Sequence, residues 1–429
     1  MRILKITHDY FPTIGGSELV FQRIAEGLAA RGEDVWVFTS TARRTSDFID
    51  PRATGYPPGL ENINGVKVRR FRYLRFPSRV RRTVNRWTMA WWSHGWPGYG
   101  HAKSVFVGPY LPSLVREAVR LRPDVIVATA SPFRPIYLAA RAARRARVPV
   151  AIMPCIHPGD TWLLDNPALF SLLKRVDAVL TLTDYERLLL QSLGVPPSRL
   201  HYLAGGVSAD AAEAPAEADL RKRFGFTDNE PLVLFLGRKE EHKGVMDVAQ
   251  AMISLWRAGS TARLVLAGAS TPYSEHVLEP FLRDLPTEWR SRIVSRTDIT
   301  EAEKWGWYRA CSFLVHPSRV ESFGLIYLEA WLLGKPVIGC RSGPVSSLIR
   351  HGRDGVLVGY GNREELETAI ARMLEDPEAA RAMGEEGRRK TLQTFTWRHV
   401  VDRAHAIYRT LIEEYDSANT RQRHSRHLQ

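Results

Sequence analysis

The sequence of 429 residues predicts an α/β protein with two Rossmann-like domains, each a parallel sheet covered by helices. Three observations predict this fold class. The chain is too long for one ordinary hydrophobic core, so two domains are expected. Short runs rich in β-branched residues alternate with longer helical patterns from end to end. Most of the short runs are continuously apolar, as strands buried on both faces require.

Two series of strands are predicted, one in each half of the chain. They cover residues 3–7, 34–40, 66–71, 124–130, 148–153 and 177–183, and then 232–237, 263–269, 292–297, 312–318, 336–340 and 355–359. A stretch rich in Ala, Pro and acidic residues, 208–225, predicts a surface linker between the two series. The predicted organisation is a first domain over 1–207, a second over 208–395, a C-terminal helix over 396–416 and a frayed basic tail over 417–429.

The composition indicates a soluble protein with acidic partners. Lys and Arg number 60 against 46 Asp and Glu, and the net charge of +14 favours phosphates, nucleic acid or anionic lipid surfaces as partners. The 3 cysteines are far apart, which argues against zinc and a disulfide framework. With no signal peptide and no long apolar run, we expect a cytoplasmic protein whose membrane contact, if any, is peripheral at the inner face.

Ligands of open α/β sheets bind beyond the carboxyl ends of the strands, so residues there are candidate site residues. Gly15 and Gly16 follow the first strand, where a helix N-terminus favours anions. Arg238 and Lys243 follow the first strand of the second half and could neutralise a diphosphate. Taken alone, the glycines also fit a plain turn, and the cations fit a solvated loop paired with its own glutamates.

A third candidate lies in 316–330, "HPSRVESFGLIYLEA", where a helix is predicted to start near Phe323. Glu321 precedes this helix and Glu329 lies about two turns into it, so helical rise predicts a separation of ~10 Å. That is too far for the paired carboxylates of a glycosidase, about 5–9.5 Å apart. Carboxylates so placed suit hydroxyl groups at opposite ends of one ligand. They also fit a helix-dipole glutamate and an ordinary surface glutamate. The three sites together favour a nucleotide-sugar, anionic in the middle and polyhydroxylated at both ends.

The same stretches carry a resemblance to a known family. "FPTIGGSE" (11–18), "FLGRKEEHKG" (235–244), "VHPSRVESFGLIYLEAWLLGKPVIGC" (315–340) and "HGRDGVLVGYGNREEL" (351–366) occur in its order. The chain resembles the family-4 retaining glycosyltransferases of the GT-B fold, also called glycosyl transferases group 1. This resemblance implies two domains facing across a deep crevice, an acceptor-binding first domain, a nucleotide-sugar-binding second domain, and a C-terminal helix packing back on the first domain.

The resemblance also implies residue roles. Arg238 and Lys243 would stabilise the leaving diphosphate, Glu329 would hold the ribose, and Glu321 would hold the donor sugar. His157 would lie near that sugar and, with Arg238, Lys243 and Glu321, makes up the predicted catalytic set. The remaining predicted donor contacts are backbone groups of Gly15, Gly16, Phe323, Gly324 and Leu325.

The implied reaction is transfer of a sugar from a UDP- or GDP-linked donor to an acceptor hydroxyl with retention. No Asp-x-Asp signature is present, so we predict no metal and no cofactor. The alternatives are another GT-B enzyme, such as a phosphorylase or a sugar-nucleotide epimerase, or a non-enzymatic basic binding protein. The last is disfavoured because Arg238, Lys243, Glu321 and Glu329 are all present.

One basic and aromatic stretch of the first domain has no counterpart in the resemblance. From Asn62 to Arg116 there is no acidic residue. Arginines beside tryptophans could dock on an anionic membrane or an acceptor, which would be a glycan, a lipid-linked sugar or a small molecule. A solvated arginine face with tryptophans in the core or a dimer interface stays open. Nucleic-acid binding is not expected, since no such motif is present. The candidate docking residues are Arg79, Arg81, Arg82, Arg86, Trp87, Trp91 and Trp92.

Overall fold

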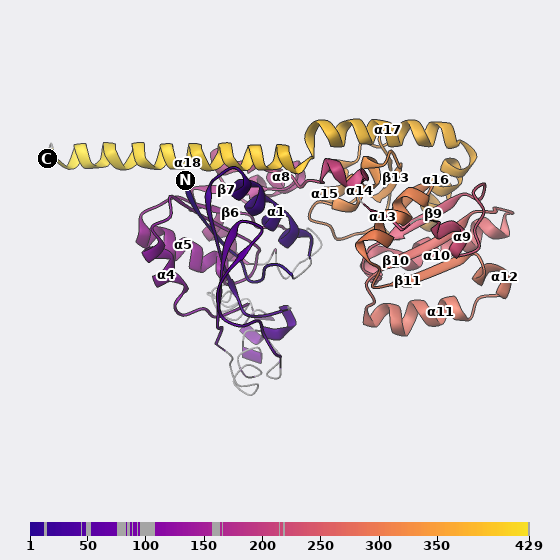
Figure 1. Ribbon diagram of the computed structural model, residues 1–429, viewed down its shortest axis with the longest axis horizontal. Coiled ribbons are helices and arrows are strands. Elements are labelled where there is room, and N and C mark those ends of the chain that lie inside the picture. Colours follow the sequence, from indigo (N-terminus) through magenta and orange to yellow (C-terminus); the bar gives the residue numbers. More distant parts are fainter. Residues whose placement is uncertain are drawn as a thin grey trace. The chain divides into compact units, whose positions relative to one another are not determined.

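The computed structural model divides the chain into two compact units, which Figure 1 shows with their elements labelled. Unit 1 comprises 1–204 and 397–429, and unit 2 comprises 205–396. The structure describes residues 1–12, 15–43, 45–48, 53–74, 83, 86–87, 89–91, 93–94, 108–156, 164, 166–213, 215–217 and 219–427.

Unit 1 is built on a sheet of 8 strands in the order β3-β4-β2-β1-β5-β6-β7-β8. All neighbouring strands pair in parallel except β3 and β4, which form an antiparallel hairpin. The strands are β1 (Arg2–Ile6), β2 (Asp34–Ser40), β3 (Gly59–Ile63), β4 (Val66–Phe71), β5 (Val125–Ala128), β6 (Val150–Ile152), β7 (Ala178–Thr181) and β8 (Leu200–Tyr202).

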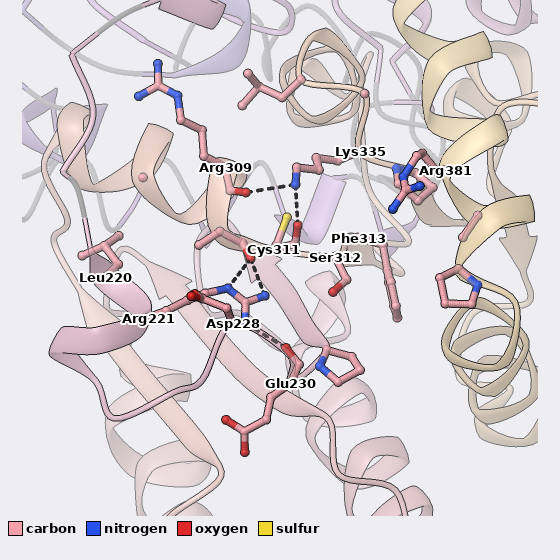
Figure 2. A pocket seen from close by; sticks show the side chains of 18 of the residues that line it. Leu220, Arg221, Asp228, Glu230, Arg309, Cys311, Ser312, Phe313, Lys335 and Arg381 are labelled. Carbon is pink, nitrogen blue, oxygen red and sulfur yellow. Dashed lines mark hydrogen bonds between the residues drawn. The ribbon is translucent and has the colours of Figure 1, made fainter.

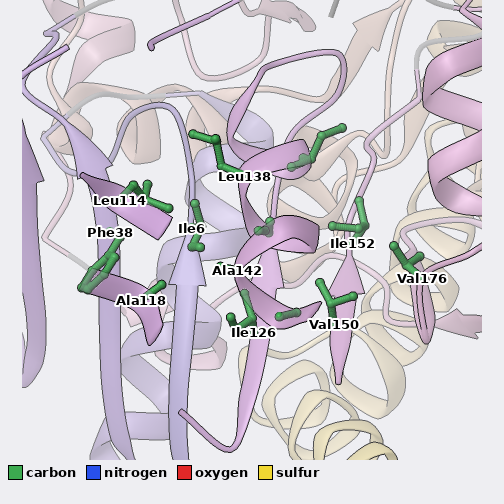
Figure 3. Close-up of a cluster of buried hydrophobic side chains, with 14 of the residues drawn as sticks. Ile6, Phe38, Leu114, Ala118, Ile126, Leu138, Ala142, Val150, Ile152 and Val176 are labelled. Carbon is green, nitrogen blue, oxygen red and sulfur yellow. The ribbon is translucent and has the colours of Figure 1, made fainter. Parts of the chain in front are cut away.

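The α-helices of unit 1 are α1 (Gly16–Ala30), α4 (Leu114–Leu121), α5 (Pro135–Ala146), α7 (Pro167–Leu173), α8 (Asp184–Ser192) and α18 (Trp397–His427). Short 3₁₀ turns are η1 (Thr45–Phe48) and η2 (Pro197–Arg199). Figure 3 shows the core on one face of the sheet, where α4 and α5 contribute Leu114, Ala118, Leu138 and Ala142. Small alanines on the inner faces of the two helices let them pack closely on the apolar strands.

Unit 2 has a fully parallel sheet of 6 strands in the order β11-β10-β9-β12-β13-β14. These are β9 (Leu232–Leu236), β10 (Arg263–Gly268), β11 (Ile293–Thr297), β12 (Phe313–His316), β13 (Val337–Cys340) and β14 (Val356–Val358). The central strands are buried along their whole length. Two parallel-sheet α/β units confirm the predicted fold class.

The α-helices of unit 2 are α9 (Leu220–Arg223), α10 (Val245–Arg257), α11 (Glu279–Arg283), α12 (Thr287–Arg290), α13 (Glu301–Ala310), α14 (Leu325–Leu332), α15 (Gly343–Leu348), α16 (Arg363–Glu375) and α17 (Pro377–Thr394). Short helical turns are η3 (Ala209–Glu213), η4 (Glu241–Lys243) and the π-turn η5 (Ser274–Leu278).

The C-terminal helix α18 packs on α1 within unit 1. A Cβ atom at Gly27 of α1 would lie 2.5 Å from Val401 Cγ2, so the absent side chain permits a close approach of the two helices. The helix continues to His427, so the predicted helix end at 416 is too early. No Gly or Pro interrupts residues 397–427, which leaves the sequence without a stop signal.

Candidate active site

The predicted donor residues of unit 2 lie beyond the carboxyl ends of β9 and β12, two neighbouring strands at the centre of the sheet. From β9 the chain continues to β10 and β11 on one side, and from β12 to β13 and β14 on the other side. Strand order therefore reverses between β9 and β12. Such a switch point leaves a crevice between diverging loops, which is where ligands of open α/β sheets bind.

The loop after β9 carries the predicted cations. Arg238 is 62% exposed, with its guanidinium 3.0 Å from the Glu240 carboxylate. The next residue, Lys239, is buried and donates to Ser295 Oγ at 2.7 Å and to Glu279 Oε1 at 3.2 Å. Lys239 therefore fixes the loop to the sheet, while Arg238 remains free to reorient toward an anion.

Lys243 and Glu321 form an ion pair across the switch point. Lys243 Nζ donates to Glu321 Oε1 at 2.6 Å and to the carbonyl of Val320 at 2.9 Å. His316 Nε2 lies 3.1 Å from the same Glu321 oxygen. Gly237, at φ +148°, makes room for this histidine, because a Cβ there would lie 2.9 Å from His316 Cε1. Both partners thus engage Oε1 and leave Oε2 of Glu321 available to a ligand hydroxyl.

The electrostatics keep Glu321 ionised although it is largely buried. Burial by itself would raise the pKa of this carboxyl group, but the charge of Lys243 and the contact with His316 outweigh it and hold the pKa well below its ordinary value. Burial lowers the pKa of His316, which favours the neutral imidazole. The site therefore pairs one ammonium with one carboxylate at neutral pH.

The turn between the two glutamates presents backbone amides. Helix α14 begins at Leu325 rather than near Phe323, because its N-cap Gly324 adopts a left-handed φ of +99° that ends the preceding loop. The amides of Phe323, Gly324 and Leu325 donate to no other residue that the structure describes. Glu321 lies outside the helix, so the separation predicted from helical rise does not apply.

The second glutamate, Glu329, lies on α14 and is held by two side chains of α13. Lys304 Nζ donates to Glu329 Oε1 at 2.9 Å, and the Tyr308 hydroxyl donates to Oε2 at 2.9 Å. Sequence reasoning missed both partners. Their spacing of four residues puts them on one face of a helix, a signal that could have marked them as a pair.

Unit 1 has its own switch point, between β1 and β5. Gly15 is the N-cap of α1 and Gly16 its first residue. His8 and Asp9 follow β1, with His8 Nε2 3.2 Å from Asp9 Oδ1 and 3.7 Å from Glu18 Oε1. His8 also stacks on Phe133, with ring centroids 4.0 Å apart. Sequence reasoning did not single out His8 or Asp9, although both stand immediately after a strand.

The unit 1 cluster lacks a compensating cation among the described residues. Burial, and then the charge of Glu18, raise the pKa of Asp9 to about 7. Burial lowers the pKa of His8 to about 3. One ligand atom from each of His8, Asp9 and Glu18 lies within 4.8 Å of the others, close enough to hold a metal ion.

Several predicted residues cannot be compared with the structure. His157, Arg79, Arg81, Arg82 and Trp92 lie outside the described residues. The three other candidate docking residues are described: Arg86 and Trp87 are exposed, Trp87 to 65%, and Trp91 is half-buried. Within the described ranges, no helix is both long enough and apolar enough to cross a bilayer.

A cavity of about 1020 Å³ lies at the opposite, amino-terminal edge of the unit 2 sheet and is shown in Figure 2. Arg221 Nε donates to the carbonyl of Ala310 at 3.0 Å, and Lys335 Nζ donates to those of Arg309 and Cys311 at 2.9 and 2.7 Å. These cations satisfy carbonyls at the C-terminal end of α13 and complement its dipole. The cavity therefore lies away from the predicted donor residues, and these two of its cations serve the fold.

Comparison with known proteins places the chain in a family. Residues 216–390 match the family described as Glycosyl transferases group 1, and residues 15–206 match the Glycosyl transferase 4-like domain. Anabaena HepE in complex with UDP superposes with a TM-score of 0.70 at 18% identity, covering 96% of this chain and 100% of that one. Sucrose-phosphate synthase from Thermosynechococcus elongatus superposes with a TM-score of 0.68 at 20% identity, covering 96% of this chain and 100% of that one. The chain belongs to the family-4 glycosyltransferases of the GT-B fold, which confirms the resemblance.

Curated relatives match over a smaller part of their length. D-inositol 3-phosphate glycosyltransferase from Thermobispora bispora is 30% identical over 232 residues, 53% of this chain and 54% of the relative. GDP-mannose-dependent alpha-(1-6)-phosphatidylinositol monomannoside mannosyltransferase from Mycolicibacterium smegmatis is 29% identical over 277 residues, 62% of this chain and 71% of the relative. The match thus spans about half of the first of these relatives.

Proposed function

We propose that the protein transfers a sugar from a UDP- or GDP-linked donor to an acceptor hydroxyl with retention. The observation that carries the proposal is the Lys243–Glu321 pair at the unit 2 switch point, beside three amides that donate to none of the described residues. One cation, one carboxylate oxygen and a helix N-terminus together match a diphosphate joined to a polyol. The first domain, 1–207, would take the acceptor, and the second, 208–395, the donor.

In the proposed reaction the bond between the anomeric carbon and the phosphate oxygen breaks, and its electrons remain on the diphosphate. The acceptor oxygen forms the new bond on the same face, and its proton passes to the departing diphosphate. Lys243 has a third N–H for that negative charge, since its other two bind Glu321 and Val320. Arg238 would leave Glu240 to make a bidentate contact, and Glu321 Oε2 would accept from a sugar hydroxyl.

His157 would lie near the donor sugar, and Gly15 and Gly16 would reach the donor from the first domain. We propose that neither a metal nor another cofactor is needed. Activity should therefore survive dialysis against EDTA, with the His8, Asp9 and Glu18 cluster as the place where a required metal would otherwise be sought. A loss of turnover that Mg²⁺ or Mn²⁺ restores would contradict this.

The donor is tested by a thermal-shift panel of UDP, GDP and ADP and their sugars. A ligand at about 100 times its dissociation constant adds ~2.7 kcal/mol of stability, enough for a clear shift. We propose that Glu329 accepts from the ribose hydroxyls, so we expect UDP or GDP to stabilise the wild type and Glu329→Gln to lose most of that shift. Stabilisation by none of the three nucleotides would overturn the proposed function. Steady conversion of the nucleotide-sugar without an acceptor would favour an epimerase. Release of a sugar 1-phosphate from a glycan by inorganic phosphate, without any nucleotide-sugar, would favour a phosphorylase.

For the acceptor, we propose a polyol on a lipid or a glycan, presented at an anionic membrane by the basic stretch around Arg79, Arg81, Arg82 and Arg86. The support is the charge of that stretch, the exposed Trp87, and the phosphatidylinositol monomannoside acceptor named for the Mycolicibacterium relative. Sedimentation with phosphatidylglycerol vesicles should fall when Arg79, Arg81 and Arg82 become Gln. The matched control replaces the same number of arginines by Gln on α5, at Arg141, Arg144 and Arg145, which are all exposed. Absence of vesicle binding by the wild type would end the docking proposal.

A further inference from the structure

We infer that Lys304 and Tyr308 of α13 are positioning residues that hold Glu329 in place for the donor ribose. The inference rests on the proposed function, in which Glu329 accepts from the ribose hydroxyls. Lys304 binds one carboxylate oxygen and Tyr308 the other, so the carboxylate plane is fixed from both sides. Neither residue is assigned a role by the motifs that identify the family.

The carboxylate keeps acceptor capacity in this arrangement. Each oxygen of an ionised carboxylate has about two acceptor sites, and α13 uses one on each oxygen. Tyr308 is fully buried and its hydroxyl lies 3.3 Å from the carbonyl of Ile326 as well, so it is held close to the backbone of α14. The remaining acceptor sites, one per oxygen, suit two neighbouring hydroxyls of a ribose.

The side chains that hold Glu329 are one cation and one neutral donor. Burial alone would lower the pKa of Lys304, but Glu329 and Glu301 outweigh it and raise the pKa, so the ammonium persists at neutral pH. Burial raises the pKa of Tyr308 well above its ordinary value, which keeps the phenol a neutral donor. Without Lys304, the mostly buried Glu329 carboxylate would lose its ion-pair partner and the contact that orients it.

Helix α13 is anchored at both ends, which makes it a firm support. At its N-terminus Thr300 Oγ1 accepts from the Glu303 amide at 3.1 Å, and Glu303 in turn binds Arg296 at 2.8 Å. At its C-terminus Arg221 and Lys335 bind the last carbonyls, as Figure 2 shows. Arg221 and Lys335, which line the cavity at the amino-terminal edge of the sheet, therefore fix one end of α13. Two other residues of the same helix, Lys304 and Tyr308, hold Glu329.

The test compares nucleotides with and without ribose hydroxyls. Dissociation constants for UDP and 2′,3′-dideoxy-UDP, or the GDP pair if GDP binds better, are measured by calorimetry on the full chain. We expect the wild type to prefer the ribonucleotide by about tenfold, or ~1.4 kcal/mol. Lys304→Met and Tyr308→Phe should each reduce that ratio to about twofold or less, while the dideoxynucleotide binds as before. Lys304→Arg should restore the ratio in part.

Glu301→Gln is the matched control, because Glu301 also pairs with Lys304 at 2.6 Å but is exposed and does not touch Glu329. Its ratio should equal that of the wild type. The positioning role would be overturned if Lys304→Met and Tyr308→Phe both kept the wild-type preference for the ribonucleotide. It would also be overturned if they weakened the binding of both nucleotides equally. A wild type that binds both nucleotides equally would overturn it as well, because Glu329 would then not hold ribose. A wild type that binds no nucleotide would instead refute the proposed function.

Discussion

The carboxylates at the carboxyl edges of the two sheets differ in their partners: those of unit 2 form ion pairs with lysines, and those of unit 1 do not. In unit 2, Glu321 is paired with Lys243 at 2.6 Å and Glu329 with Lys304 at 2.9 Å. In unit 1, Asp9 is buried beside His8, and Glu186 is buried with backbone amides of Ile156 and Leu182 as its donors. Neither of these unit 1 carboxylates has a Lys or Arg ion-pair partner among the described residues.

This difference decides which carboxylates are charged at neutral pH. Burial raises the pKa of Asp9 and of Glu186 to about 7, because no nearby cation offsets the loss of hydration. Burial acts on Glu321 as well, but Lys243 and His316 reverse its effect and lower the pKa. Glu321 of unit 2 is therefore an anion at neutral pH, whereas unit 1 has carboxyl groups that titrate in the neutral range.

The largest expected effect comes from breaking the unit 2 ion pair. Lys243→Met leaves Glu321 largely buried without its cation, which costs roughly 3–5 kcal/mol of unfolding free energy. Turnover should fall at least tenfold, equivalent to about 1.4 kcal/mol in the barrier. Chemical denaturation followed by tryptophan fluorescence, together with donor turnover, measures both quantities.

The double variant Lys243→Met with Glu321→Gln is the control for that experiment. Removing both charges should restore much of the stability but none of the activity, since the two losses share one interaction. If the single and double variants are equally stable, the ion pair does not operate as described.

The next effect is the change of stability with pH, to which Asp9 of unit 1 and Glu321 of unit 2 contribute with opposite signs. The folded pKa of Asp9, about 7, lies above its ordinary value of 3.8, so between these values the folded chain binds more protons than the unfolded chain. The contribution of Asp9 to the unfolding free energy therefore falls as pH rises through that window, by on the order of a few kcal/mol. Glu321, with a lowered pKa, stabilises the fold above its ordinary pKa and loses this contribution as pH falls.

Asp9→Asn and Glu321→Gln separate the two contributions in melting temperatures measured from pH 2 to 8, because the contribution of Glu321 changes only below its ordinary pKa of 4.5. Asp9→Asn should reduce the loss of stability toward pH 7, whereas Glu321→Gln should reduce the loss toward acid. An Asp9→Asn profile parallel to that of the wild type would mean that Asp9 does not titrate in this range.

A smaller effect is expected from the glycines at the two helix starts. Gly324→Ala forces a side chain into a left-handed conformation, with its Cβ 2.6 Å from the Tyr327 ring, and should cost about 1–3 kcal/mol. Gly16→Ala meets no atom within 4 Å and lies in the first turn of α1, so its stability should be close to that of the wild type. Denaturation midpoints of the two variants check this, and equal losses would contradict it.

The smallest effect on stability is expected at Arg238. Because this side chain is mostly exposed and forms a surface ion pair with Glu240, Arg238→Gln should change the unfolding free energy by about 0.5 kcal/mol or less. Turnover should nevertheless fall, since the guanidinium would contact the diphosphate. A variant with unchanged turnover would remove Arg238 from the site.

Much of this arrangement could be predicted because it depends on local patterns. Apolar runs predicted the strands, and strand ends predicted that the loops carrying Lys243 and Glu321 would meet. The hairpin strand β3 was missed because its residues are mostly exposed and form no continuous apolar run, although the Asn64-Gly65 turn that follows it signals a hairpin. The three-residue strand β8 was too short to leave a pattern.

The partners of the site residues could not be predicted in the same way. Lys304 and Glu329 are 25 positions apart, on helices whose packing depends on the whole sheet. Burial shifts the pKa values of His8 and Asp9, and the extent of burial depends on the folded chain rather than on local sequence. Helix α14 begins two residues after the predicted start near Phe323, because the left-handed backbone of Gly324 cannot be read from the sequence alone.

The packing of α18 on α1 has a consequence for biosynthesis. Val400, Ala404 and Tyr408 of α18 are fully buried within unit 1, yet they are translated after the whole of unit 2. A nascent chain ending near residue 204 therefore lacks part of its apolar core, whereas 205–396 is continuous in sequence. The core of unit 1 is therefore complete only after the last helix has been synthesised, whereas unit 2 is built from one continuous segment.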